Sequence, residues 1–246
     1  MSQDHPPHLG PIQLLAGYAQ GLFPMARAAD DPRLYWFNPP FRGILPVGGV
    51  HMSRSLRRSL ARGGWTADAR PDFDRIVRHC ADRPETWINA PLLQLYHRLH
   101  DSGHAQALAV YQDGALAGGI FGVTLGGAFF GESMFSTRTD GSKMALVWLS
   151  DHLARCGFTL FDTQYLTPHL ASMGGVEITR EDYRARLAHA LRQPADYHAL
   201  PLRSAAELAA RGGYSAASAP SSSSTGVVSP SGPMPSPPSG SAVSGS

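Results

Sequence analysis

The sequence of 246 residues predicts a mixed α/β (α+β) domain, in which helices cover one mixed sheet and a small N-terminal lobe precedes it. Three observations support this fold class. Helical patterns fill residues 53–103, a meander of three apolar runs follows at 108–135, and a helix and strand pattern come next at 143–165. Helical and strand patterns in this order indicate layers packed around one core.

Residues 1–62 form the predicted N-terminal lobe. Residues 11–21 predict a short helix, because a proline suits its first position and a glycine can end it in a left-handed conformation. Residues 34–46 are predicted as an irregular segment, since their prolines exclude a central strand and allow only edge pairing. The three adjacent aromatics at 35–37 either fill a small core or form a platform on which a nucleic-acid base stacks.

Capping residues mark the elements up to residue 103. A short polar side chain before an apolar helical pattern can accept a hydrogen bond from the first turn, and glycines suit the end of a helix. The predicted elements are a helix over 53–61 capped by Ser53, a strand over 65–67, a helix from Asp72 through Cys80, and a helix from Asn89 to Gly103.

Turn residues separate the strands of the meander. Asp113-Gly114 joins runs 108–111 and 116–123, and Leu125-Gly126-Gly127 leads into the run 129–135. The elements predicted after the meander are a helix over 143–156 capped by Ser142, a strand over 158–165, and a last helix opened by Thr179. Residues 63–200 therefore form the predicted main domain.

Composition sets the remaining limits. The chain is 43% hydrophobic, so it can build a sizeable core, and its net charge is +2. Residues 213–246 carry no charge and are rich in Ser, Pro and Gly, which predicts a disordered tail. The N-terminus lacks a signal-peptide pattern, and Cys80 and Cys156 have no metal-ligand spacing. We expect a cytoplasmic protein with reduced thiols and neither a metal nor a membrane span.

A local basic patch follows residue 52. Twenty of the 21 basic residues are arginines, and no acidic residue stands between Met52 and Ala67. Arginine forks suit phosphate groups, although an arginine-rich helix face is often only solvated. The arginines of this patch are Arg54, Arg57, Arg58 and Arg62.

Two strand ends carry polar side chains. Glu132 follows the apolar pair Phe129-Phe130, and Asp162 and Gln164 lie at the end of the strand predicted at 158–165. A buried unpaired carboxylate is costly, so Glu132 needs a partner or a ligand. These strand ends form either the floor of a site or a structural hydrogen-bonded pair.

The order of elements resembles the acetyltransferase-like fold (the acyl-CoA N-acyltransferase type), in which an acyl donor binds where two central strands separate. That fold holds a pyrophosphate in a glycine-rich loop before its central helix. Here the loop is Arg138-Thr139-Asp140-Gly141-Ser142-Lys143, and Lys143 replaces a small residue. A long side chain there obstructs close approach to a pyrophosphate, which disfavours coenzyme A.

A more specific resemblance covers residues 12–195. In order and spacing, the chain closely resembles the leucyl/phenylalanyl-tRNA–protein transferases. The matching motifs are Tyr18-Ala19-Gln20-Gly21-Leu22-Phe23-Pro24-Met25, Trp36 with Pro39 and Arg42, Thr86-Trp87-Ile88, Gly118-Gly119 with Gly122, Gly131-Glu132-Ser133-Met134-Phe135-Ser136, Ser142-Lys143 with Ala145-Leu146, Asp162-Thr163-Gln164, His169 with Ala171-Ser172 and Gly174, Glu177-Ile178, and Tyr183.

The resemblance implies an enzyme that moves leucine or phenylalanine, and possibly methionine, from aminoacyl-tRNA to the N-terminal Arg or Lys of acceptor proteins. The product would carry a destabilising N-terminal residue, which marks it for N-end-rule degradation. The donor ester is already activated, so the resemblance implies no cofactor. A monomer is expected. Residues 63–200 would then be the acetyltransferase-like catalytic domain.

The resemblance also implies roles for individual residues. Asp162 would act as the base, directly or through oriented polar groups, and Gln164 would relay or orient. The expected contacts are Trp36, Phe37 and Trp87 around the terminal adenosine, an apolar pocket of Ile120, Phe129 and Met134 for the donor side chain, Glu132 for polar groups of the donor or the acceptor cation, and the arginines of the basic patch for tRNA phosphates. Because Phe129 and Met134 differ in strand parity, a bulge is expected, with Gly131 a suitable place.

Two other functions remain open. One is a coenzyme A-dependent N-acetyltransferase, which Lys143 and the aromatic N-terminal lobe disfavour. The other is a non-catalytic tRNA-binding module, which the polar pair Asp162 and Gln164 on an apolar strand disfavours.

Overall fold

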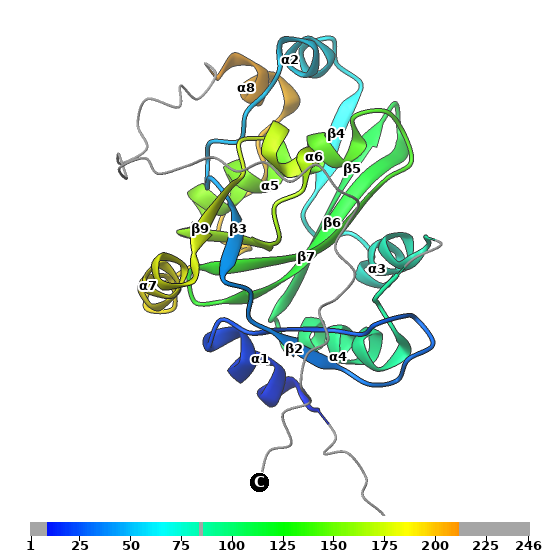
Figure 1. Cartoon of the computed structure of the whole chain (residues 1–246). Coiled ribbons are helices and arrows are strands. Elements are labelled where there is room, and N and C mark those ends of the chain that lie inside the picture. Colours follow the sequence, from blue (N-terminus) through cyan, green and yellow to red (C-terminus); the bar gives the residue numbers. More distant parts are fainter. Residues whose placement is uncertain (1–8, 84–85, 212–246) are drawn as a thin grey trace, which may run out of the picture.

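A seven-stranded mixed sheet forms the centre of the protein (Figure 1). The computed structural model describes residues 9–83 and 86–211, so the tail predicted at 213–246 lies outside the described residues. All neighbouring strands are antiparallel except β7 and β8. The order is β4 (Trp65–Asp68), β5 (Ala105–Gln112), β6 (Ala115–Leu125), β7 (Ala128–Ser136), β8 (Leu160–Gln164), β3 (Phe41–Leu45) and β9 (Val176–Thr179).

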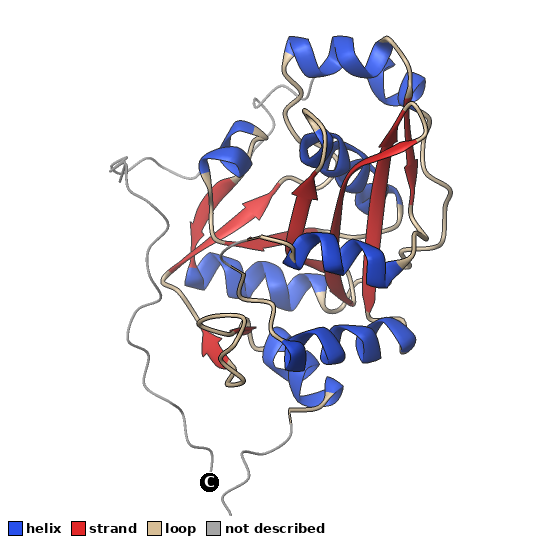
Figure 2. Ribbon diagram, turned by 90° about the vertical axis from the view of Figure 1, so that its right-hand side faces the viewer, coloured by secondary structure: helices blue, strands red, loops and turns tan. Residues whose placement is uncertain are grey.

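Helices cover both faces of this sheet (Figure 2). The buried side chains form two clusters, one on each face. We call them the α4 face and the α5 face. The helices packed on the α4 face are α1 (Pro11–Ala19), α3 (Phe73–Ala81), α4 (Ala90–Asp101) and α7 (Arg180–Ala190). Those on the α5 face are α2 (Arg54–Ala61), α5 (Gly141–Arg155), α6 (Pro168–Ser172) and α8 (Ala205–Ala210).

Four predicted helix caps are confirmed. The side chains of Ser53, Asp72, Asn89 and Thr179 each accept a hydrogen bond from the backbone N–H three residues later. The fifth was wrong. Helix α5 begins at Gly141 after Asp140, which has a left-handed φ of 66°, so Ser142 lies inside the first turn.

The prediction that residues 34–46 contain no central strand was also wrong. Strand β3 pairs with β8 on one side and β9 on the other. Prolines stand just outside β3, at 39, 40 and 46, so none of them removes a ladder hydrogen bond from inside it. The segment before it forms a separate two-stranded sheet of β1 (Phe23–Met25) and β2 (Tyr35–Phe37). Thus residues 41–45, assigned from sequence to the N-terminal lobe, belong to the large sheet.

None of the helices within residues 9–83 and 86–211 combines the length and apolar character that crossing a lipid bilayer demands.

Candidate active site

The candidate site lies where the ladder between the parallel strands β7 and β8 ends. These strands pair only through Ala128–Phe130 and Leu160–Asp162. Beyond these residues β7 continues to pair with β6, and β8 pairs with β3. The predicted polar side chains Glu132 and Gln164 each lie two residues beyond the last paired residue of their strand.

A β-bulge sets which way the side chains of β7 point. Gly131 pairs with Gly122 and Ser133 pairs with Phe121, which leaves Glu132 as the extra residue. The sequence predicted a bulge at Gly131, and the structure confirms one, at the next residue. Because the extra residue resets the alternation, Phe129 and Met134 both join Ile120 in the cluster on the α5 face. The three residues predicted for the donor side chain therefore lie together.

Glu132 points to the opposite, α4 face and is surrounded by hydrogen-bond donors. The hydroxyl of Tyr18 donates to Oε1 at 2.6 Å, and the hydroxyl of Tyr96 donates to Oε2 at 2.7 Å. The amide Nε2 of Gln164 also donates to Oε2, at 3.3 Å. Glu132 is 7% exposed, and no cation contacts its carboxylate among the described residues.

The electrostatics of Glu132 follow from this setting. Burial raises its pKa to about 7, although the hydrogen bonds from Tyr18, Tyr96 and Gln164 oppose that shift. Burial likewise raises the pKa of both tyrosine hydroxyls well above its usual value, so they remain protonated donors. The site thus holds a carboxyl group that can take up or release a proton near neutral pH.

Asp162 has a different environment, because it is locked in a buried ion pair. Arg42 Nε donates to Oδ1 at 2.9 Å, and Arg42 Nη2 donates to Oδ2 at 2.7 Å, which is the bidentate geometry of a strong pair. The Tyr183 hydroxyl donates to Oδ2 and the Gln164 backbone N–H donates to Oδ1. Both carboxylate oxygens therefore accept two hydrogen bonds each.

Arg42 anchors this pair to the N-terminal segment. Its Nη1 donates to the carbonyl of Gly21 at 3.0 Å, and its guanidinium lies 4.4 Å from the ring centre of Phe23. Gly21 has a left-handed φ of 80°, as predicted for the residue that ends α1. Burial alone would lower the pKa of Arg42, but the charge of Asp162 outweighs it and raises that pKa.

Gln164 connects the two carboxylates. Its backbone N–H bonds Asp162, its side chain bonds Glu132, and its φ of 65° is left-handed, which is costly for a residue with a Cβ. The bond to Asp162 holds this conformation. The structure brings together all three polar residues predicted for the site.

The predicted adenosine contacts all lie near the α4 face but differ in exposure. Trp36, in β2, is 36% exposed, and its ring packs so closely on Gly17 of α1 that any side chain at Gly17 would collide with it. Phe37 is half-buried against the core and stacks on Phe23 with ring centres 5.8 Å apart. Trp87 is half-buried against the same core.

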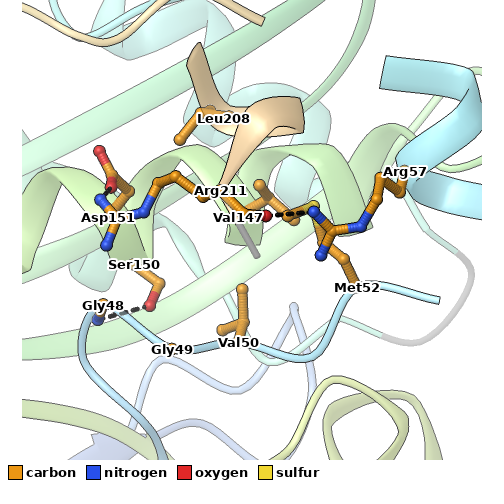
Figure 3. A pocket seen from close by; sticks show the side chains of 10 residues that line it. All are labelled: Gly48, Gly49, Val50, Met52, Arg57, Val147, Ser150, Asp151, Leu208 and Arg211. Carbon is orange, nitrogen blue, oxygen red and sulfur yellow. Dashed lines mark hydrogen bonds and ion pairs between the residues drawn. The ribbon is translucent and has the colours of Figure 1, made fainter. Parts of the chain in front are cut away.

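The four predicted phosphate contacts are not equivalent. Arg54 and Arg58 are exposed on α2, and Arg62 is exposed directly after its last residue. Arg57 instead points toward α8, where its Nη1 donates to the carbonyls of Ala209 and Arg211. Figure 3 shows the bond to Arg211 at a pocket of about 60 Å³ between α2, α5 and α8. Arg57 thus packs α8 against α2.

Sequence reasoning missed the partners of both carboxylates. Tyr18, Arg42 and Tyr183 stand within the matching motifs without an assigned role, and Tyr96 lies unassigned within the helix predicted from Asn89 to Gly103. Their side chains supply the hydrogen bonds described above. That such donors surround the two carboxylates could have been expected from the rule that a buried carboxylate needs hydrogen-bond donors. Among the described residues, no three His, Cys, Asp or Glu side chains are grouped to hold a metal ion.

Comparison with known proteins identifies the family of the chain. The family model described as "Leucyl/phenylalanyl-tRNA protein transferase" matches residues 44–188, and the model of that family's N-terminal domain matches residues 9–40. Curated relatives named leucyl/phenylalanyl-tRNA–protein transferase include one from Paracoccus denitrificans, 62% identical over 191 residues (77% of this chain and 90% of the relative). Another, from Dinoroseobacter shibae, is 56% identical over 213 residues (86% and 96%). A third, from Jannaschia sp., is 51% identical over 195 residues (79% and 92%). The chain belongs to the leucyl/phenylalanyl-tRNA–protein transferase family.

Proposed function

We propose that this protein transfers leucine or phenylalanine from aminoacyl-tRNA to the N-terminus of a protein. The close, nearly full-length relatives that carry this name support the activity. The observation in the structure that carries it is the network in which Gln164 joins Glu132 to the Asp162–Arg42 pair at the end of the β7–β8 ladder. For the acceptor we propose an N-terminal Arg or Lys, which the resemblance implies, and a product destined for N-end-rule degradation.

The reaction needs an amine and an activated ester. The acceptor's α-amine attacks the ester carbonyl, a new C–N bond forms, the C–O bond to the ribose breaks, and the ribose oxygen leaves with a proton. An α-ammonium group has a pKa of about 7.7–8.0, so it must first lose a proton. Glu132, with a pKa of about 7, is suited to accept it or to bind the acceptor's cation.

We infer that Asp162 acts through Gln164 rather than as the base itself. Four hydrogen bonds and a guanidinium charge occupy its carboxylate. Each of its oxygens already accepts two hydrogen bonds from the protein, which leaves no lone pair free to accept a proton from an acceptor amine. Its bond to the Gln164 N–H instead fixes the amide that reaches Glu132.

The donor would lie across the end of the ladder. Its side chain would contact Ile120, Phe129 and Met134 on the α5 face, while the polar network lies on the α4 face. Ile120 and Phe129 are 3% and 1% exposed, so the half-buried Met134 is the side chain suited to move aside, being unbranched and flexible. A pocket of this kind separates donor side chains that differ by a methylene by only about 1–3 kcal/mol.

We also propose the acetyltransferase-like fold for the main domain. One parallel pair in an otherwise antiparallel sheet, with its ladder ending early, supports this proposal. The position of β3 favours a lobe boundary near residue 40 instead of 62. The cytoplasmic location and the monomeric state remain predictions.

The test is transfer of labelled leucine from leucyl-tRNA to a peptide beginning with Arg and to a matched peptide beginning with Ala. Labelling of the first alone would support both donor and acceptor. Labelling of neither peptide, with acetyl-coenzyme A consumed on an amine instead, would refute the proposal and favour an N-acetyltransferase.

A further inference from the structure

Arg83 is an exposed cation held rigidly beside the candidate site. It follows α3, and its Nε donates to the carbonyl of Cys80 at 3.0 Å. Its Nη2 donates to Ser133 Oγ at 2.9 Å and to the carbonyl of Met134 at 2.7 Å. Ser133 and Met134 follow the last residue of β7 that pairs with β8. The guanidinium therefore lies along the part of β7 that forms the site.

The charge of Arg83 is not neutralised within residues 9–83 and 86–211. Its acceptors there are two backbone carbonyls and a hydroxyl, and no carboxylate of those residues forms an ion pair with it. Arg42, by contrast, is paired with Asp162. Its three hydrogen bonds order the exposed side chain in advance, and no carboxylate of the described residues takes up its positive charge.

A nucleic-acid donor brings phosphates to this place. Arg83 touches Met134, which belongs to the proposed donor pocket, and it precedes Trp87, a proposed adenosine contact, by four residues. A guanidinium fork matches a phosphate in shape as well as in charge. We propose that Arg83 binds the phosphodiester that joins the last two nucleotides of the donor tRNA. This inference rests on the proposed function.

Donors of different length test this assignment directly. We would measure transfer from phenylalanyl-tRNA, from phenylalanyl-cytidylyl-adenosine, which has one phosphate, and from phenylalanyl-adenosine, which has none. Arg83→Gln should raise KM for the first two on the order of 10- to 100-fold, as expected for one charge-assisted hydrogen bond. With phenylalanyl-adenosine, kcat/KM should stay within about twofold of the wild-type value, because the bond at issue is absent.

Two further variants separate binding from structure. Arg83→Lys keeps the charge but loses the two-pronged guanidinium. It should therefore raise KM for the same two donors, but by a smaller factor than Arg83→Gln. Arg75→Gln removes an exposed charge from α3 and should leave all three donors unaffected. For phenylalanyl-tRNA, the slope of log KM against log salt concentration should become shallower by about 0.7 in Arg83→Gln alone.

Three results would overturn the assignment. Equal losses with phenylalanyl-adenosine and with the dinucleotide donor would mean that Arg83 only holds β7 in place. A loss confined to phenylalanyl-tRNA would place the contact at another phosphate, and no loss with any donor would remove the contact altogether. Absence of transfer by the wild-type protein from every donor would instead refute the proposed function.

Discussion

Replacing Glu132 with Gln should remove a pH-dependent cost to stability. In the folded chain burial raises the pKa of Glu132 to about 7, whereas in an unfolded chain a glutamate has a pKa of about 4.3. Between these two values the folded state keeps a proton that the unfolded state has released. Stability therefore falls as pH rises through this window, and well above pH 7 the full cost, roughly 4 kcal/mol, is present.

The assay is urea unfolding of the wild type and Glu132→Gln at pH 5 and at pH 8.5. Gln keeps one acceptor oxygen, and a tyrosine hydroxyl can accept from its amide, so a constant offset between the two proteins is expected at both values. Between pH 5 and pH 8.5, the unfolding free energy of the variant minus that of the wild type should rise by about 3 kcal/mol. Glu177→Gln, at an exposed position, is the control. Parallel pH profiles for wild type and Glu132→Gln would refute the reasoning.

Asp162→Ala should lower the unfolding free energy by about 3–5 kcal/mol, because it leaves Arg42 buried without its carboxylate. Undiminished stability in urea would contradict this. Trp87→Ala should weaken binding of aminoacyl-tRNA by the free energy of one base–aromatic stack, about 1–3 kcal/mol, and KM should rise accordingly. An unchanged KM would exclude stacking there. Arg58→Gln should weaken tRNA binding and its salt dependence, whereas Arg57→Gln should mainly lower stability, by roughly 1 kcal/mol. Equal effects of both on tRNA affinity would show that α8 does not sequester Arg57.

Local patterns predicted much of the fold, because caps and turns are decided within a few residues. Ser53, Asp72, Asn89 and Thr179 each satisfy a backbone N–H three positions away, and that geometry needs no tertiary contact. The same reasoning failed where a tertiary contact decided the outcome. Strand β3 carries the arginine that pairs with β8, and residues 120 positions apart in the chain leave no local pattern.

The candidate site shows the same division. The residue types Glu132, Asp162 and Gln164 were visible as polar groups ending apolar strands. Their partners were not, since Tyr96 has the spacing of an ordinary core residue in α4 and its hydroxyl bond to Glu132 spans 36 residues. A sequence can therefore indicate that a buried carboxylate needs donors without indicating which tyrosines supply them.

The proposed chemistry rests on a difference between the two carboxylates that composition alone would not reveal. Arg42 pairs with Asp162 inside the protein, so Asp162 can be fully buried and can hold Gln164 in a left-handed conformation. Glu132 has hydroxyl and amide donors but no contacting cation among the described residues, so its burial raises its pKa into the range where an amine loses its proton. Two acidic residues on adjacent strands thus differ because one faces a guanidinium and the other faces two tyrosines. Loss of activity in an Asp162 variant would then follow from the displacement of Gln164, and it would not identify Asp162 as the base.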